Sequence, residues 1–489
     1  MSNSKPIIPS IKLKDGFTVP RVLTGLWQVA DMEREAKLGQ YDTQVADMKR
    51  YAEAGFNTFD MADHYGSAED ITGAYLHKFG SEMPIQAMTK WVPKPGAITK
   101  DIVREAVNVS LKRMQSEQLD MLQFHAWQYA DPAWLDALYY LQELKEEGLI
   151  KHLGLTNFDT AHLRMVVKSG IEVVSNQVCF SLLDMRAAGA MTQLCKETGV
   201  KLFAFGTVAG GFLTNKWLGK AEPKLDEDLT WSQMKYKRFI DTAGGWAHFQ
   251  ELLQVLDKIA KTHQVSIPNV ATRFMLEQQA VASVIIGARL GESSHLEDNA
   301  KLFGFALSAE ELTEIYEVLA GFDAIPGDCG DEYRKPPFLT ASGDLSHHFE
   351  SFPAPYPVKP GSDGRSKALS GTVWEDMAGF SRAVRKGNTI AVSGTTATHG
   401  DKVIGPGDPA AQAHYVIDKI EGALMSLGSS LEDVIRTRIF VRNVDDWEPI
   451  ARAHGERFAN IQPANTLVEA KLVGDEYLVE IEADAIVED

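Results

Sequence analysis

Residues 119–157 read LDMLQFHAWQYADPAWLDALYYLQELKEEGLIKHLGLTN. Two apolar, strand-like runs, 119–127 and 151–157, flank a longer segment. Leucines recur in that segment near the 3.6-residue period of a helix, at Leu135, Leu138, Leu141 and Leu144. A strand, a helix and a second strand in this order are typical of a parallel βαβ unit. The stretch therefore predicts an α/β fold.

The same alternation runs from about residue 21 to residue 320. Six further strand-like runs are VLTGLWQV (22–29), NTFDMA (57–62), IQAMTKW (85–91), VVSNQVCF (173–180), KLFAFGT (201–207) and ASVIIGA (282–288). Eight strands that alternate with helices over about 300 residues predict a (β/α)8 TIM barrel. The rival is a doubly wound sheet, which usually carries GxGxxG after its first strand. No such motif follows the first strand here.

A Pro/Gly-rich stretch interrupts this pattern between about 321 and 370. Such a composition is typical of a linker. From about residue 371, five strand-like and two helix-like runs follow in an α+β layout. We therefore expect a barrel over residues 1–325, a linker over 326–370 and a smaller α+β domain over 371–489.

Composition narrows the functional class. The formal net charge is −18, and an acidic surface repels nucleic acid and anionic membranes. We therefore expect a small-molecule substrate, with neither nucleic acid nor a membrane as partner. Three widely spaced cysteines, Cys179, Cys195 and Cys329, form neither a disulfide framework nor a metal pattern. The first residues lack the apolar core of a signal peptide, and no run reaches the ~18 apolar residues of a membrane span. The expected location is the cytoplasm, and no metal is expected.

Polar residues gather where the predicted strands end, which is where a barrel of this kind carries its active site. Read in chain order, these residues are Asp60, Tyr65, Lys90, His125, Asn157 and Gln177. Each alone has a structural explanation, since a tyrosine near a turn usually packs and a lysine at a strand end is usually solvated. The set as a whole points to chemistry, because successive strand ends meet at one mouth of the barrel.

The residue types suit the reduction of a carbonyl group. Hydride attack on carbon builds negative charge on oxygen, which needs a proton donor. Tyrosine has an ordinary pKa near ~10, and a neighbouring ammonium group lowers it by favouring the phenolate. Tyr65 fits the donor, Lys90 the ammonium and Asp60 the carboxylate that holds it. A neutral His125 would donate a further hydrogen bond to the oxygen.

These residues stand in stretches that resemble the aldo-keto reductase family: FDMADHYG (59–66), LQFHAW (122–127), SNQVCFSLLD (175–184) and IIGARLGESSHLEDN (285–299). The resemblance covers residues ~20–320. It implies that Asp60, Tyr65, Lys90 and His125 form a catalytic tetrad. It also implies an extended nicotinamide cofactor, with NADPH expected and NADH possible, and a small-molecule carbonyl substrate.

The resemblance further implies the cofactor-binding residues. They are Gly25, Trp27, Thr156, Asn157, Gln177, Phe205, Gly206, Thr207, Gly210, Leu213, Gly287, Arg289 and Asn299. Asn157 and Gln177 would hold the nicotinamide carboxamide, and Phe205 would stack on the ring where the family usually has Tyr. Residues 206–213 would flank the pyrophosphate, and the residues after 286 would approach the adenosine. Gly287 and Ala288 stand where the family often has Lys or Ser, which weakens the case for NADP over NAD.

The C-terminal region resembles the RidA/YjgF family in SGTTA (393–397), GPGDPAAQ (405–412) and QPANT (462–466). Members are trimers with ligand pockets between subunits, so a homotrimer is implied. Asn465 stands where the deaminating members carry Arg, which makes imine deamination doubtful. By alternation we expect six apolar residues on the sheet face that the helices leave open, where a partner would bury them: Ile390, Val392, Ile439, Val441, Val479 and Ile481. The alternative is that these residues face the helices.

Three functions remain open from the sequence. The first is an NAD(P)H-dependent reductase of aldehydes or ketones. The second is a nucleotide-bound scaffold that acts as a redox sensor. The third is a bifunctional enzyme that joins carbonyl reduction to imine hydrolysis, against which Asn465 counts.

Overall fold

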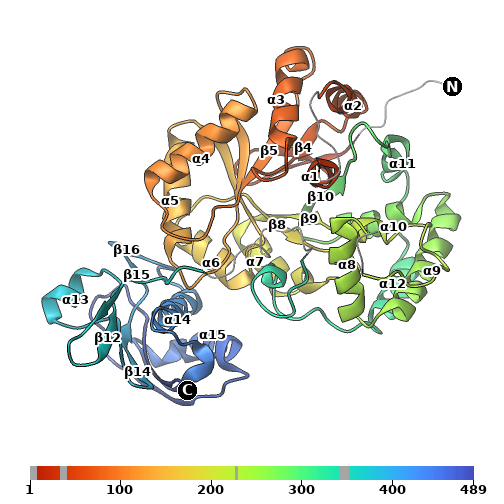
Figure 1. Ribbon diagram of the computed structural model, residues 1–489. Helices are drawn as coiled ribbons and strands as arrows, with labels where there is room; N and C mark the ends of the chain where they lie inside the picture. Colours follow the sequence, from red (N-terminus) through yellow and green to blue (C-terminus); the bar gives the residue numbers. More distant parts are fainter. Residues whose placement is uncertain (1–7, 34–40, 226–228, 341–351, 489) are drawn as a thin grey trace.

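The computed structural model describes residues 8–33, 41–225, 229–340 and 352–488. Figure 1 shows a barrel ringed by helices and, beside α6, a smaller unit built on a separate sheet. Eight parallel strands close the barrel in the order β10-β3-β4-β5-β6-β7-β8-β9. The predicted (β/α)8 fold is therefore confirmed.

The barrel strands are short apolar runs, buried on both sides because side chains fill the interior and helices cover the outside. They are β3 Val22–Gly25, β4 Thr58–Asp60, β5 Gln86–Trp91, β6 Leu119–Phe124, β7 Ile150–Thr156, β8 Ser175–Cys179, β9 Lys201–Phe205 and β10 Val281–Gly287. The helices are α1 Trp27–Glu33, α2 Asp42–Glu53, α3 Ala68–Phe79, α4 Lys100–Arg113, α5 Ala133–Glu146, α6 Thr160–Lys168, α7 Ala190–Thr198, α8 Trp231–Thr242, α9 Trp246–His263, α10 Ile267–Leu276, α11 Leu296–Lys301 and α12 Ala309–Leu319.

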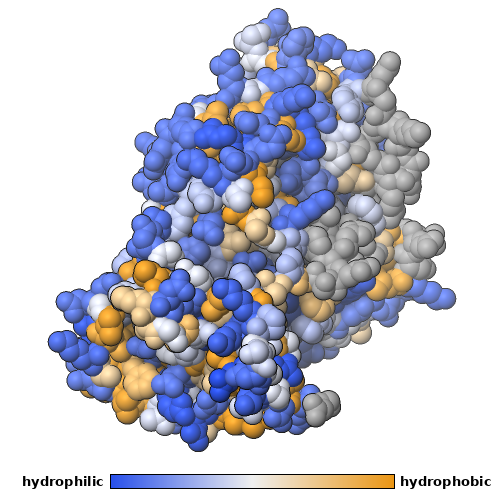
Figure 2. Space-filling model, turned by 60° about the vertical axis from the view of Figure 1, so that its left-hand side comes forward, coloured by the Kyte–Doolittle hydropathy of each residue, from blue (hydrophilic) through white to orange (hydrophobic). Residues whose placement is uncertain are grey.

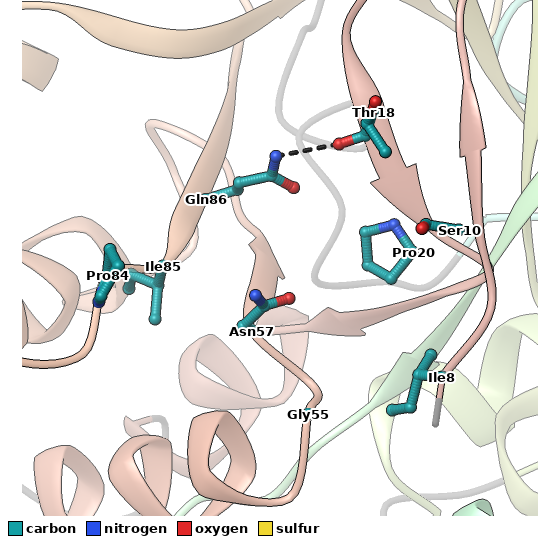
Figure 3. A pocket seen from close by; sticks show the side chains of 9 residues that line it. All are labelled: Ile8, Ser10, Thr18, Pro20, Gly55, Asn57, Pro84, Ile85 and Gln86. Carbon is teal, nitrogen blue, oxygen red and sulfur yellow. Dashed lines mark hydrogen bonds between the residues drawn. The ribbon is translucent and has the colours of Figure 1, made fainter. Parts of the chain in front are cut away.

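A hairpin of β1 Ser10–Lys12 and β2 Thr18–Pro20 lies at the N-terminal ends of the barrel strands, where Leu13 and Val19 pack with core residues. A pocket of about 510 Å³ lies beside this hairpin, and Figure 3 shows the residues that line it. Its lining includes Asn57 and Gln86, and the Gln86 side-chain amide donates to the Thr18 carbonyl at 2.9 Å. This end lies opposite the strand ends that carry the predicted chemistry, so the pocket is not the candidate active site.

The smaller unit holds a seven-stranded sheet in the order β11-β12-β13-β14-β19-β17-β18. Its strands are β11 Val358–Pro360, β12 Arg365–Ala368, β13 Ala383–Lys386, β14 Thr389–Thr395, β17 Val434–Val441, β18 Ala464–Glu469 and β19 Val479–Ile486. A short helix, α13 Val373–Ala378, follows β12, and β15 Thr398–His399 pairs with β16 Lys402–Val403. Two longer helices, α14 Pro409–Ser426 and α15 Trp447–Phe458, pack together, and α14 covers β14 and β19.

One expectation about this sheet is wrong. The six apolar residues assigned to its open face are all buried in the core that contains the α14 side chains: Ile390, Val392, Ile439, Val441, Val479 and Ile481. The opposite face carries charged residues, and Arg438 there binds Glu482 at 2.9 Å and Asp484 at 3.1 Å. Alternation separates the two faces of a strand, but only tertiary packing decides which face the helices cover.

The Pro/Gly-rich stretch joins both units through packed segments. Its end contributes β11 and β12 to the second sheet. Its beginning, which we call the strap (residues 328–340), folds back over the barrel. The Asp328 carboxylate accepts from the Thr160 amide at 2.7 Å, and the Asp328 carbonyl accepts from Arg186 at 2.7 Å. The strap therefore reaches the loops at the C-terminal ends of the barrel strands.

Candidate active site

Three of the four predicted catalytic residues meet at the C-terminal ends of β4 and β5. Asp60 ends β4, Lys90 lies in β5, and Tyr65 lies in the loop between β4 and α3. The Lys90 ammonium is 2.6 Å from Asp60 Oδ2 and 5.1 Å from the centre of the Tyr65 ring. Asp60 and Lys90 are buried. The structure thus places a paired ammonium beside the phenol.

The Asp60–Lys90 pair is held rigidly. Oδ1 of Asp60 accepts from the side-chain amides of Gln123 at 2.9 Å and Gln177 at 2.8 Å. The ammonium also donates to the Met61 carbonyl at 2.9 Å. Burial lowers the pKa of Lys90, and the Asp60 carboxylate opposes that effect. Four fixed hydrogen bonds keep the two charges in place under the Tyr65 ring.

His125 follows β6, the neighbour of β5 in the barrel. Burial, and then the nearby Arg334 guanidinium, lower the pKa of His125 well below its ordinary value, so the imidazole is neutral at neutral pH. Its Nδ1 lies 3.4 Å from the Thr156 carbonyl, whereas its buried Nε2 has no hydrogen-bond partner among the described residues. An unpartnered ring nitrogen at the mouth suits a hydrogen bond to a carbonyl oxygen.

Several predicted cofactor residues present unsatisfied polar groups. Asn157 Oδ1 and Thr207 Oγ1 are buried without a hydrogen-bond partner among the described residues. Gly206 and Gly210 have φ values of +78° and +61°, which favour glycine. A Cβ on Gly206 would lie 2.2 Å from the Tyr236 hydroxyl. Buried polar groups normally find partners, so these residues fit a ligand that brings amide and phosphate groups.

The remaining predicted residues lie at the ends of barrel strands or in the segments that follow those strands. Gly25 pairs with Gly287 across β3 and β10, Phe205 ends β9, and Leu213 is buried. Thr156 Oγ1 donates to the Gln177 carbonyl at 3.2 Å, and Asn299 lies in α11. The Trp27 ring is 4.9 Å from the Tyr65 ring. Arg289 Nε binds Glu292 at 2.8 Å. The Gln177 amide is already bonded to Asp60, a contact that the sequence did not indicate.

The strap also forms part of the mouth, which was not predicted from the sequence. Arg334 donates to the Asn157 carbonyl at 2.7 Å and to the Ala126 carbonyl at 3.0 Å. The Tyr333 ring lies 5.7 Å from the His125 ring. The sequence DEYRKPP (331–337) has no helical or strand periodicity. Its Pro-rich surroundings instead indicate a linker. No sequence pattern indicates that this segment packs against the C-terminal ends of the barrel strands.

Two features of the described residues bear on other functions. Within the described ranges given above, no group of three or more His, Cys, Asp or Glu side chains is placed to bind a metal ion. In those same ranges no helix combines the length and the apolar character needed to cross a membrane. The three cysteines are buried and free of disulfides.

The C-terminal unit has no cation at the position that the family resemblance singled out. The Asn465 amide on β18 donates to the Thr437 hydroxyl of β17 at 2.9 Å. Glu480 lies on the polar face of β19, where burial and then the neighbouring Glu482 raise its pKa. A neutral amide cannot form the bidentate pair that an arginine forms with a carboxylate.

Comparisons with known proteins agree with both resemblances. Residues 21–320 match the family model described as the aldo/keto reductase family, and residues 373–487 match the one described as Endoribonuclease L-PSP. The NADH-specific methylglyoxal reductase of Escherichia coli is 25% identical over 291 residues, which cover 54% of this chain and 83% of the relative. An uncharacterized Streptomyces coelicolor protein, SCO2049, is 35% identical over 125 residues, covering 25% of this chain and 93% of that protein.

The glycerol dehydrogenase AKR11B4 of Gluconobacter oxydans is similar in structure, with a TM-score of 0.54 and 20% identity. The match covers 65% of this chain and 97% of that one. At this identity the similarity concerns the fold alone, and it agrees with the closed barrel described above.

Proposed function

The chain belongs to the aldo/keto reductase family over residues 21–320, and from this membership we propose that it reduces the carbonyl group of an aldehyde or ketone with NADPH. Family membership makes the chain an oxidoreductase, here fused to a RidA-like domain. The observation that carries the finer proposal is the buried Asp60–Lys90 pair beside Tyr65. An intact pair of this kind favours catalysis over a purely regulatory role.

The side chains then take the following roles. The bound cofactor supplies the hydride. Tyr65 donates its phenolic proton to the carbonyl oxygen, and the Lys90 ammonium stabilises the phenolate that remains. Asp60 keeps the ammonium in position, and its own orientation is set by Gln123 and Gln177. In the tautomer that carries its proton on Nε2, His125 donates to the same oxygen, and the 3.4 Å contact between Nδ1 and the Thr156 carbonyl is then not a hydrogen bond. The product is an alcohol, and Tyr65 regains its proton from solvent.

The residues around the mouth fit such a cofactor. Asn157 Oδ1 is placed to bind the carboxamide, and the Phe205 ring offers a flat face for stacking. We propose NADPH rather than NADH, because the Arg289 guanidinium lies at the predicted adenosine end and suits a 2′-phosphate. NADH is the alternative cofactor, because the Escherichia coli methylglyoxal reductase described above is NADH-specific. Three buried thiols support a reducing compartment, which we propose is the cytoplasm.

Oxidation of NADPH against a panel of aldehydes, ketones and quinones, followed by absorbance, tests the reductase. Tyr65→Phe removes only the proton donor, so we expect kcat to fall by about 100-fold or more while cofactor binding is retained. A cofactor dissociation constant close to that of the unaltered protein serves as the control for folding. Near-normal turnover by Tyr65→Phe with any substrate would overturn the assignment of the tetrad.

For the C-terminal unit we propose assembly into a homotrimer without imine deaminase activity. Nine of the fifteen large hydrophobic residues exposed in the described chain lie after residue 371: Val373, Trp374, Met377, Ile435, Val444, Trp447, Val468, Val473 and Ile486. Figure 2 shows hydrophobic residues gathering on this lower part of the molecule. Exposed apolar surface of this kind favours contacts between subunits. Asn465 in place of Arg counts against deamination.

A further inference from the structure

Helix α8 presents one of its faces to the catalytic mouth. Trp231 and Lys235 are four residues apart, so they lie on the same side of this helix. The Trp231 ring is 5.9 Å from the Trp27 ring, and the Trp27 ring is 4.9 Å from that of Tyr65. Lys235 therefore extends toward the mouth one helical turn after a residue that already lines it.

The Lys235 ammonium lies between two aromatic residues of the mouth. It is 4.9 Å from the centre of the Phe205 ring and 4.6 Å from that of Tyr333. Tyr333 is in turn 5.7 Å from the ring of His125. Lys235 is only 8% exposed. A buried positive charge thus lies next to the residues expected to contact the nicotinamide and the carbonyl.

The ammonium has N–H donors left for a further ligand. It carries three N–H donors, and its one hydrogen-bond acceptor among the described residues is the Tyr333 hydroxyl at 2.7 Å. No carboxylate oxygen of those residues lies within ion-pair distance of it. The nearby Glu332 already binds Arg186 at 2.8 Å, and Lys235 affects it only at longer range. A buried ammonium normally has an anionic partner within contact distance.

We propose that Lys235 binds a carboxylate on the substrate, so that the preferred substrates are aldehydes or ketones that also carry a carboxylate group. This inference rests on the proposed reductase function and names its substrate class. A carboxylate would accept one or two of the remaining N–H donors in a site from which water is largely excluded, where charge-assisted hydrogen bonds are strong. The catalytic tetrad holds the other end of the same molecule by its carbonyl oxygen.

Matched substrate pairs test the proposal on the full-length protein. Each pair has one acid and one neutral analogue: succinic semialdehyde with butanal, and 4-carboxybenzaldehyde with methyl 4-formylbenzoate. We expect the unaltered enzyme to prefer the acids. In Lys235→Met, kcat/KM for the acids should fall by at least about 30-fold, as expected when one partner of a buried charge pair is lost. The neutral analogues should change by less than about threefold, and Lys235→Arg should recover part of the loss.

A second readout does not depend on turnover. Terephthalate, a dicarboxylate without a reducible group, should bind the NADP⁺-loaded enzyme in calorimetry, and Lys235→Met should abolish that binding. Lys235→Gln replaces Lys235→Met if the latter fails to fold, as judged by circular dichroism. The dissociation constant for NADPH should stay unchanged in both variants, which separates a substrate carboxylate from a cofactor phosphate.

The outcomes distinguish this inference from the proposed function. Reduction of neutral aldehydes with no preference for acids would overturn the role of Lys235 and leave the reductase standing. An equal loss on acids and neutral analogues, or a weaker affinity for NADPH, would assign Lys235 to structure or to the cofactor instead. Failure to reduce any aldehyde would overturn the reductase, and terephthalate binding would then decide the carboxylate site alone.

Discussion

Nε2 of His162 on α6 lies 2.9 Å from Oδ2 of Asp418 on α14, so a buried histidine joins the barrel to the C-terminal unit. Nδ1 of the same ring lies 2.6 Å from Asp159, the residue that caps α6. Arg457 of α15 also donates to Asp418 and to Glu421. The contact between the two units therefore includes a buried network of alternating charges.

This network continues into the catalytic mouth. The His162 ring stacks on Tyr129 at 3.3 Å, and the Arg334 guanidinium lies 4.5 Å from the centre of the Tyr129 ring on which it rests. Arg334 binds the carbonyl of Asn157, which has the strained φ of +59°. A continuous set of packed side chains thus links Asp418 to the predicted nicotinamide site.

Substituting Asp418 should weaken both the contact between the units and catalysis. Asp418→Ala leaves His162 and Arg457 buried without their shared carboxylate, so we expect a loss of about 3–5 kcal/mol in stability. Because Arg334 rests on the same stack, kcat should also fall. Thermal unfolding and NADPH oxidation measure the two effects.

Asp136→Asn is the matched control, because it alters another contact between the units, the 2.7 Å pair with His399, which is more exposed. It should cost less than about 1 kcal/mol and leave kcat unchanged. Equal effects of Asp136→Asn and Asp418→Ala on kcat would show that the His162 network does not reach the mouth.

The titration of His162 should contribute to the pH dependence of stability. Burial opposes its charged form, but the carboxylates of Asp159 and Asp418 outweigh burial and raise the pKa of His162. A raised pKa in the folded state gives stability that is complete below about pH 6.5 and is lost as pH rises through the folded pKa. The pKa of Asp418 is lowered, despite burial, by His162 and Arg457. The contribution of the Asp418 carboxylate to stability is therefore lost only at acidic pH.

Urea unfolding of the unaltered protein and of His162→Gln between pH 6 and 9 tests this. The stability difference between the two should shrink as pH rises. His125 has a lowered pKa and so has the opposite pH dependence, but its effect cancels in the comparison. A difference that stays constant from pH 6 to 9 would mean that His162 does not titrate in this range.

Truncation should separate the strap from the C-terminal domain. A chain ending at residue 340 keeps Tyr333 and Arg334, whereas one ending at residue 325 loses both. We expect the longer chain to be the more active, because Arg334 supports the carbonyls of Ala126 and Asn157. Full-length Arg334→Met, measured alongside, should show a loss of kcat in the same direction. Equal activity of the two truncated chains would remove the strap from the site.

Cofactor choice should depend on Arg289. In Arg289→Ala we expect the NADPH dissociation constant to rise by about tenfold, since a guanidinium bound to a phosphate is lost. The value for NADH should change by less than about twofold. Quenching of tryptophan fluorescence measures both constants. Parallel changes for the two cofactors, or tighter binding of NADH by the unaltered protein, would contradict the proposed preference.

Assembly should depend on residues 371–489. Light scattering on the full chain should give the mass of a trimer, and a chain ending at residue 340 should be monomeric. Met377→Glu introduces a charge at a residue that is 65% exposed, and we expect it to weaken association, because Met377 belongs to the exposed apolar surface proposed to form subunit contacts. A monomeric full chain, or a trimer that persists in the shorter chain, would overturn the proposed assembly.

The barrel, and which polar residues meet at its mouth, could be predicted from the sequence alone. Periodicity is a local property, so eight alternations of strand and helix could be read directly, and parallel strands necessarily bring their carboxyl ends together. Asp60, Tyr65 and Lys90 could therefore be assigned to one mouth from their positions alone. The motifs around residues 393–397 and 462–466 similarly identified the C-terminal family.

Features that depend on contacts between distant segments could be seen only in the folded structure. The strap has no periodicity, so its contact with Asn157 could not be predicted from its sequence. Alternation placed Ile390 and Ile481 on one face of the sheet, but the packing of α14 decided that this face is the buried one. The His162–Asp418 pair joins residues 256 positions apart, and Lys235 meets Tyr333 from another element. Such pairs form because folding brings their elements together, and a local pattern contains no information about the partner.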